Sequence, residues 1–255
     1  MFENNKGIYP KTTGTVILGE DVGGTFATGV TQNISILANN SNQGIAVARP
    51  EVDSLVRRLP LLLRTPDGWV ASYGTEVLKV LAGADTYIIK TNDNGLEEIR
   101  VKGLPAVPVD SLGRKWISFV NTSQTNLQEM DVENKFVFIG FTAKGIMPQL
   151  STPIGYLEPH KIQAALAESI LIENSPYVPD WSLAVEILIF SITSVLAWYL
   201  INIFGITLGI LLTSLLFLLT ASSGYYLIQQ GLLIDVTWAL ISQFITASTA
   251  FYLRF

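Results

Sequence analysis

The chain of 255 residues contains no cysteine and only one histidine, His160. The absence of cysteine excludes disulfides, thiolate chemistry and cysteine-based zinc sites, and it fits either side of a membrane. A single histidine without cysteines also makes a triad of metal ligands implausible. The composition therefore predicts no metal site, and no cofactor is expected.

Positive charge is scarce, and its distribution along the chain is uneven. The net charge is −5 and the pI is about 4.9, so no basic surface for nucleic acid is expected. Fifteen of the 16 Lys and Arg residues precede Trp181, and only Arg254 follows it. The chain therefore divides into residues 1–180, long enough for one domain with its own core, and residues 181–255.

Three long apolar runs occupy this second part, and Glu186 is the only charge in the first of them. They cover about residues 183–204, 206–228 and 236–253. Each is close to the ~20 residues that a helix needs to cross the ~30 Å hydrocarbon core of a bilayer. We therefore predict three transmembrane helices rather than three buried helices of a soluble protein. For Glu186, two readings stay open: its side chain reaches the outer interface, or it is a functional acid inside the membrane.

The few charges near the predicted spans indicate their orientation. Arg254 is the only cation near a span end apart from the large domain, which favours a cytoplasmic C-terminus. Three spans then place residues 1–180 outside the cytoplasm. Residues 1–20 contain neither an apolar span nor a signal peptide. Either the first span pulls the domain across the membrane, or the chain starts inside a longer gene product, which we favour.

Residues 1–180 alternate between strand-like and helical patterns, which predicts a mixed α/β fold. The pattern indicates strands over 14–19, 44–48, 115–120 and 136–139, a hairpin over 87–101 that turns at Asn92–Gly95, and helices after Ser72 and over 159–172.

The strand predicted over 136–139 is followed by glycines with the spacing of a phosphate-binding loop. Gly140 and Gly145 are five residues apart, but Ile146 and Met147 stand where the loop needs Lys and Ser or Thr. Pro148 also prevents a helix from following directly. The sequence therefore argues against a nucleotide site.

Four ordered motifs resemble the second type of CHASE domain (CHASE-two), a family of extracellular sensory domains associated with cyclases and histidine kinases. They are an Ile-Gly strand end at 136–145, Ser-Thr-Pro at 151–153, Glu-Pro-His at 158–160 and an acidic-to-Arg-Arg-x-Pro-Leu segment at 50–61. A Pro-x-Asp-x-x-Gly turn at 108–113 and the trailing spans are also similar to the family. The resemblance implies a sensory domain, covering about residues 14–255.

The candidate ligand contacts are Arg57, Arg58, Thr152 and His160, all within these motifs. For each, a structural role is the alternative. Arg57 or Arg58 would brace the turn through Asp53 or Glu51, Thr152 would support a turn, and His160 would form hydrogen bonds at a helix start. No Ser-His-Asp arrangement is supported, because every triad would share His160.

We therefore expect a signal-sensing input domain of a bacterial transmembrane receptor, lacking its cytoplasmic output module, and not an enzyme. The expected location is the bacterial inner membrane, with a periplasmic or extracellular N-terminal domain and a cytoplasmic C-terminus. The expected partners are the lipid bilayer, an unidentified small-molecule or protein signal, and a second copy of the chain or a separate kinase or cyclase. The alternative is a membrane-anchored structural or assembly subunit without a ligand; small residues in the spans would support packing between chains.

Overall fold

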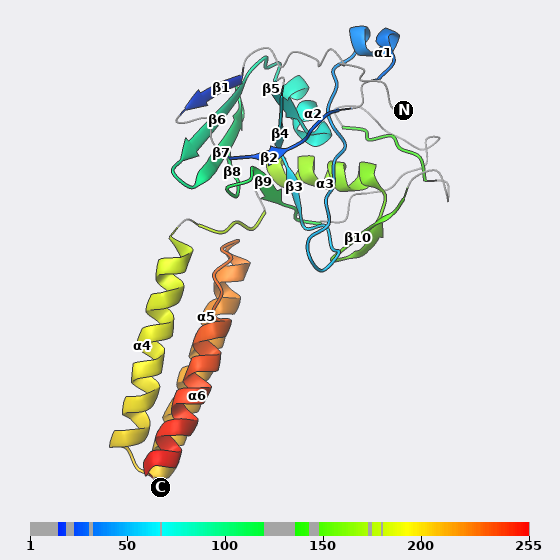
Figure 1. Ribbon diagram of the computed structural model, residues 1–255. Helices are drawn as coiled ribbons and strands as arrows, with labels where there is room; N and C mark the ends of the chain where they lie inside the picture. Colours follow the sequence, from blue (N-terminus) through cyan, green and yellow to red (C-terminus); the bar gives the residue numbers. More distant parts are fainter. Residues whose placement is uncertain are drawn as a thin grey trace. The chain divides into compact units, whose positions relative to one another are not determined.

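The computed structural model describes residues 15–18, 23–30, 33–66, 68–119, 136–142, 148–172, 175–179 and 181–254. The chain forms two compact units, Met1–Ser175 and Pro176–Phe255. The first is built of small sheets and helices, and the second is a bundle of three helices (Figure 1).

The largest sheet of the first unit has four strands in the order β1-β6-β7-β8. Strands β1 and β6 are parallel, whereas the β6–β7 and β7–β8 pairs are antiparallel, so the sheet is mixed as predicted. The strands are β1 (Thr15–Leu18), β6 (Tyr87–Asn92), β7 (Gly95–Val101) and β8 (Ala106–Pro108).

The β6–β7 hairpin turns where the Asn-Gly signal predicts it. Asn92 pairs with Gly95 across the turn, and Gly95 has a φ of 126°, which side chains rarely adopt. A Cβ atom on Gly95 would also lie 2.6 Å from the carbonyl oxygen of Ser111. Both the turn and the close approach of the 108–113 segment therefore require glycine.

The other strands form one three-stranded sheet, β2-β4-β5, and two antiparallel pairs, β3–β9 and β10–β11. Their bounds are β2 (Thr25–Phe26), β3 (Arg58–Pro60), β4 (Leu62–Thr65), β5 (Gly68–Ala71), β9 (Arg114–Trp116), β10 (Leu150–Thr152) and β11 (Gly155–Leu157). The β3–β9 pair connects two of the sequence motifs, because Arg58 lies opposite Trp116.

The first unit has three helices: α1 (Ser35–Asn40), α2 (Tyr73–Leu81) and α3 (Pro159–Leu171). Helices α2 and α3 pack against each other (Figure 1). The helical spacing predicted over 159–172 is confirmed, since Ile162, Ala165 and Leu166 are buried on one face. They join a core to which β6 and β7 contribute most, with Tyr87, Ile89 and Ile99, and to which β3, β4 and β5 also contribute.

Two predicted strands are absent from the described residues. Residues 44–48 contain only one bridge, Ile45 to Ser72, and residues 136–142 have no strand pairing. The apolar character of the second segment suggested a central strand, but Ile139 is 76% exposed. Local apolar sequence does not determine whether a neighbouring strand is present to pair with it.

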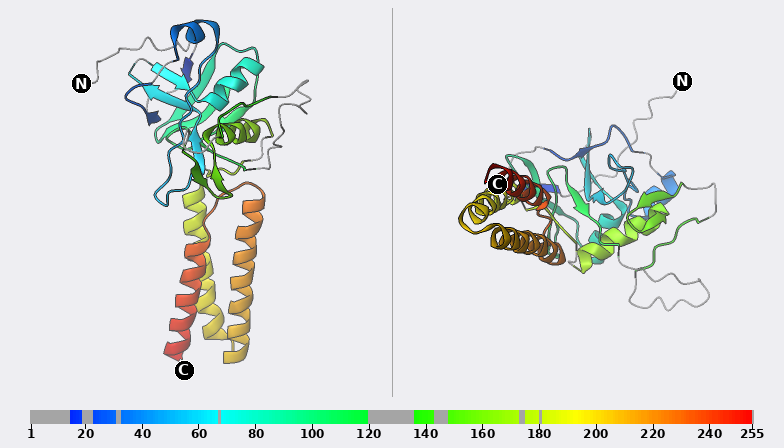
Figure 2. Two further views of the ribbon diagram at one scale, coloured as in Figure 1. Left: turned by 90° about the vertical axis from the view of Figure 1, so that its right-hand side faces the viewer. Right: turned by 90° about the horizontal axis from the view of Figure 1, so that it is seen from below.

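The second unit consists of α4 (Ser182–Ile203), α5 (Ile206–Gln229) and α6 (Thr237–Arg254). The three helices run side by side in both views of Figure 2. Of the helices in the described residues, α4 and α5 are long and apolar enough to cross a membrane. Two of the three predicted apolar helices therefore meet this criterion. Helix α6 falls short because Gln243 and several Ser and Thr residues interrupt its apolar sequence.

Candidate functional site

The predicted arginine motif begins with a tight turn between Glu51 and Leu55. The backbone N–H of Glu51 donates to the carbonyl of Leu55, and that of Ser54 donates to the carbonyl of Glu51. Ser54 has a φ of 66° and is the one residue other than glycine with a positive φ in the described part. A residue other than glycine thus holds the left-handed conformation of this turn.

Both arginines of the motif bind carboxylates that the sequence places beside them. Arg57 forms ion pairs with Asp53 at 2.6 Å and with Glu51 at 3.5 Å. The hydrogen bond from Arg57 lowers the pKa of the Asp53 carboxyl, and the same bond raises the pKa of Arg57. Arg58 binds Glu51 at 2.7 Å through its Nε.

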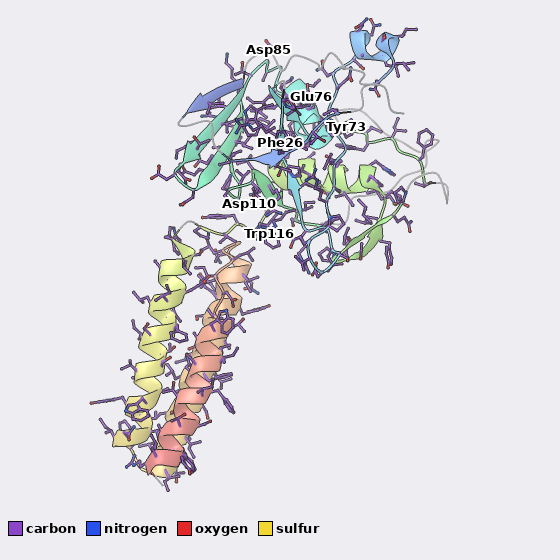
Figure 3. The ribbon with its side chains drawn as sticks, in the orientation of Figure 1. Phe26, Tyr73, Glu76, Asp85, Asp110 and Trp116 are labelled. Atoms are coloured by element: carbon purple, nitrogen blue, oxygen red, sulfur yellow. The ribbon has the colours of Figure 1, made fainter. Side chains whose placement is uncertain are left out.

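Arg58 also contacts two residues that the sequence did not assign to it. Its Nη1 lies 3.0 Å from Asp110 Oδ2, and its guanidinium lies 4.9 Å from the centre of the Trp116 ring. Asp110 and Trp116 lie close together in Figure 3. Asp110 additionally accepts hydrogen bonds from the backbone of Leu112 and Arg114. The predicted turn residue Asp110 therefore also closes an ion-pair network, which only the pairing of β3 with β9 could reveal.

A backbone hydrogen bond connects the arginine motif to the Ser-Thr-Pro motif. The N–H of Val56 donates to the carbonyl of Ser151 over 2.8 Å. Next to Ser151, the buried hydroxyl of Thr152 donates to the carbonyl of Gly155 over 2.6 Å and supports the β10–β11 turn. The structure thus gives the Thr152 hydroxyl a partner within the turn, as expected if Thr152 has a structural role.

His160 lies in the first turn of α3 and packs directly on Gly140. A Cβ atom on Gly140 would lie 2.1 Å from the imidazole ring, so only glycine fits there with the ring in this position. Beside it, Glu158 binds Lys161 at 2.9 Å and accepts a hydrogen bond from Gln149. The hydrogen bond from Lys161, together with backbone and Gln149 hydrogen bonds, lowers the pKa of Glu158 to about 2.

The candidate ligand contacts thus lie on neighbouring segments of one unit, but each engages a group of the protein itself. Arg57 and Arg58 bind carboxylates, Thr152 binds a carbonyl, and His160 covers Gly140. Their contact with a ligand stays a prediction. Lys144 and Gly145 of the glycine-spaced loop lie outside the described residues. Within the described part, no group of three or more His, Asp and Glu residues is placed to hold a metal ion.

Two buried polar groups were missed by the sequence reasoning. Lys115 is 5% exposed, and burial lowers its pKa to about 8. The hydroxyl of Tyr87 donates to Glu76 over 2.5 Å, Lys79 binds the same carboxylate at 2.7 Å, and burial raises the pKa of Tyr87. Strand alternation on β9 was the available signal for Lys115, since its neighbours Arg114 and Trp116 point the other way.

In the second unit, the segment before α4 pairs with the loop between α5 and α6. The N–H of Tyr177 donates to the carbonyl of Gly231, and the N–H of Leu233 donates to the carbonyl of Tyr177. Glu186, one turn into α4, accepts a hydrogen bond of 2.9 Å from the backbone N–H of Asp235. The Glu186 carboxylate therefore has a structural partner at the start of α6.

Comparison with known proteins places these motifs in a family. Residues 9–201 match the family model of the CHASE2 domain, which is more than half of the chain. No curated protein and no solved structure gives a significant match. The match spans the arginine motif, the histidine motif and most of α4, and it confirms the resemblance seen in the sequence. The chain thus belongs to the CHASE2 domain family, whose members are extracellular sensory domains of receptors.

Proposed function

We propose that this protein is a membrane-bound signal input: the first unit senses a signal outside the cytoplasm, and the helical bundle carries the response through the membrane. The observation that carries this proposal is that α4 and α5, which directly follow the sensory domain, are apolar but mostly exposed. Both are long and apolar, yet only 17% of the residues in the most apolar window of each helix are buried. A core helix of a soluble protein would bury most of its apolar side chains.

The exposed apolar side chains cover the bundle on many sides, which suits contact with lipid rather than water. Examples are Val195 on α4, Leu218 on α5 and Phe244 on α6, which are 70%, 62% and 70% exposed. Helix α6 has the same exposed apolar character, and its 18 residues come close to the ~20 needed to span. Its polar groups donate to backbone carbonyls within the helix, as Ser248 and Thr249 do. These features support α6 as a third span.

Three spans would place the first unit and the C-terminal end of α6 on opposite sides of the membrane. Arg254 supports a cytoplasmic position for that end. Its guanidinium donates to the carbonyls of Ile201 and Phe204 at the C-terminal end of α4, so the last turns of α4 and α6 are joined. The outer ends are joined through Glu186 and Asp235.

These contacts offer a route for a signal. The segment at Tyr177 is hydrogen-bonded to the loop before α6 and lies shortly before α4 in the chain. A displacement of this segment would therefore reach the starts of both helices. A ligand drives such a displacement only if it binds two arrangements of the first unit with different affinity. The arginine motif and His160 are the proposed contact region for that ligand.

A cysteine-labelling experiment tests the topology, because the chain has no native cysteine to interfere. Asp93→Cys places a thiol in the exposed β6–β7 turn, and Gly205→Cys places one between α4 and α5, where a Cβ meets no atom within 4 Å. We expect a membrane-impermeant maleimide to label Asp93→Cys in intact spheroplasts and Gly205→Cys only after permeabilisation. Labelling of Asp93→Cys only in opened cells would overturn the proposal.

A further inference from the structure

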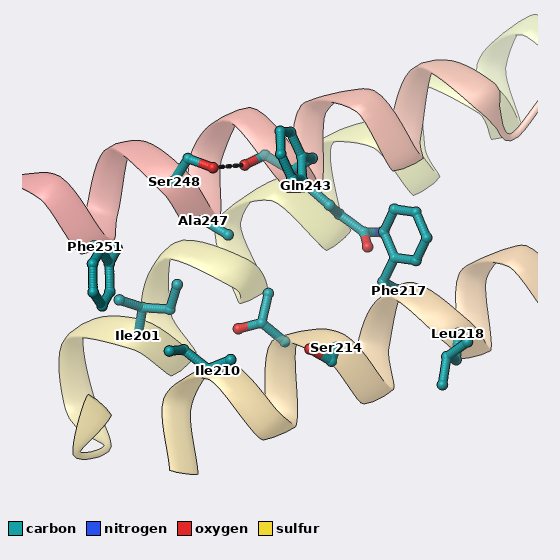
Figure 4. A pocket seen from close by; sticks show the side chains of 11 residues that line it. Ile201, Ile210, Ser214, Phe217, Leu218, Gln243, Ala247, Ser248 and Phe251 are labelled. Atoms are coloured by element: carbon teal, nitrogen blue, oxygen red, sulfur yellow. Dashed lines mark hydrogen bonds between the residues drawn. The ribbon is translucent and has the colours of Figure 1, made fainter. Parts of the chain in front are cut away.

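An open groove lies between α5 and α6 of the helical bundle. Its volume is about 610 Å³, and its lining includes Ser214, Phe217, Leu218, Gln243, Ala247 and Ser248 (Figure 4). The lining is accessible from outside the bundle, since Leu218 is 62% and Phe244 is 70% exposed. If the bundle spans a membrane, this groove faces lipid.

The groove follows from the way in which α6 is held. Helix α6 is hydrogen-bonded to α4 near its start through Asp235, in its middle through Ser242, and at its end through Arg254. Between α5 and α6, the one side-chain hydrogen bond in the described residues joins Gln243 to Thr220. Because α6 is bound along its length to α4, the side between α5 and α6 is left open.

Gln243 leaves an unpaired polar atom at this groove. Its side chain is 1% exposed and points from α6 toward Phe217 (Figure 4). The amide Nε2 donates to Thr220 Oγ1 over 2.9 Å, and the Thr220 hydroxyl in turn donates to the carbonyl of Leu216. The amide oxygen Oε1 is buried and has no hydrogen-bond partner. The Thr220 hydroxyl cannot donate to this oxygen, because its one proton is already donated to the carbonyl of Leu216.

A lipid acyl chain would fill the groove but would not satisfy this oxygen. A polar group without a partner in hydrocarbon costs free energy, and lipid tails carry no hydrogen-bond donor. The exposed Ser214 on the α5 side of the groove forms no hydrogen bond within the described residues. The groove therefore contains an unpaired amide oxygen and an exposed hydroxyl that polar side chains of another chain can pair.

We propose that the occupant is a second copy of this chain, packed groove to groove through α5 and α6. This inference rests on the proposed membrane location.

Copies inserted in the same orientation are related by an axis along the membrane normal, so equivalent residues meet at equal depth. Amide and hydroxyl groups both donate and accept, so Gln243 and Ser214 can pair with the same residues of the second copy. The small side chains of Ser214, Ala247 and Ser248 let the helices approach closely. Phe217 and Phe244 line the same groove, and one of these rings has to turn aside before a partner reaches Gln243, which is 1% exposed.

Disulfide crosslinking in native membranes tests this interface. Ser214→Cys lies in the groove, and Ser191→Cys is the matched control: an exposed serine in the middle of α4, away from the groove. Both are expressed as full chains, and carbonate-washed membranes are treated with copper phenanthroline. We expect a covalent dimer for Ser214→Cys and little or none for Ser191→Cys. Equal crosslinking of the two variants, or none for Ser214→Cys, would overturn the interface.

Gln243→Leu provides a second measurement. We expect it to weaken dimerisation in detergent by about threefold to thirtyfold, the range given by one interhelical hydrogen bond. Unchanged dimerisation would contradict a role for the amide. A chain that fills its groove with lipid alone would stay monomeric in both experiments. Loss of the protein from carbonate-washed membranes would instead contradict the proposed function, so the two failures are distinguishable.

Discussion

Two neighbouring residues of β9 show how strand alternation decides whether a basic side chain is buried or forms an ion pair. Arg114 and Lys115 are neighbours, yet Arg114 binds Asp110 at 2.9 Å on the outer face, whereas Lys115 enters the interior. No ion pair to Lys115 occurs among the described residues. Burial without a partner disfavours the charged form, and this lowers its pKa to about 8.

The lowered pKa of Lys115 predicts a pH dependence of stability. Between pH 8 and 10.5 the unfolded chain holds the proton that the folded chain has lost, so this lysine makes the free energy of unfolding rise with pH. We expect Lys115→Met to stabilise the protein at pH 7 by up to about 3 kcal/mol and to flatten that rise. Melting temperatures at pH 7 to 10 measure it, with the exposed Lys102→Met as control. A parallel pH profile in wild type and Lys115→Met would contradict the prediction.

Among the elements, the segment that leads into β3 is held by ion pairs as well as by backbone hydrogen bonds. Residues 49–57 contain no helix or strand, and Arg58 at the start of β3 connects Glu51 before it with Asp110 before β9. Charges joined in a partly buried network contribute more than isolated exposed pairs. The neighbouring Arg57 binds Asp53, whose side chain is 49% exposed, so its contribution is smaller.

This difference predicts unequal effects of two matched substitutions. Arg58→Gln leaves Glu51 with only its 3.5 Å pair to Arg57 and Asp110 with only its pair to Arg114, and we expect a loss of about 1–3 kcal/mol, or several degrees in melting temperature. Arg57→Gln should cost clearly less than Arg58→Gln, because exposed pairs are weak. Thermal unfolding of both full-length variants in detergent measures the difference. Similar losses for both would show that Arg58 does not connect the elements as described.

On the scale of the whole molecule, the sensory unit and the bundle are joined by a short segment that includes Pro176 and Tyr177. Tyr177 is hydrogen-bonded on both sides to the loop between α5 and α6, at Gly231 and Leu233. A movement that passes along the chain to α4 would therefore also reach the loop before α6. The two parallel helices, joined at both ends, would then move together.

Tyr177→Pro tests this connection, because proline removes the N–H that binds Gly231. We expect faster amide hydrogen exchange at Leu233, which donates to the carbonyl of Tyr177 in the same pairing. Val178→Pro is the control, since no hydrogen bond from the N–H of Val178 occurs in the described residues. If both variants exchange at the wild-type rate, the pairing does not hold the loop.

Much of the local structure followed from patterns within a few residues. The Asn-Gly hairpin, the helix over 159–171 and the three apolar helices were predicted because turn chemistry and periodicity act locally. The strand over 136–139 was predicted wrongly, because these residues have no strand pairing in the described part of the chain. Strand pairing depends on neighbours that are distant in sequence.

The sequence by itself therefore determined the family, the mixed α/β character of the first part and the two most apolar helices, because composition and motifs act at short range. Only the tertiary structure decided that Arg58 also meets Asp110, that Lys115 is buried, that His160 covers Gly140 and that Gln243 is left with an unpaired oxygen. Each of these features depends on how segments that are distant in the chain pack together, and this packing is a property of all the elements together.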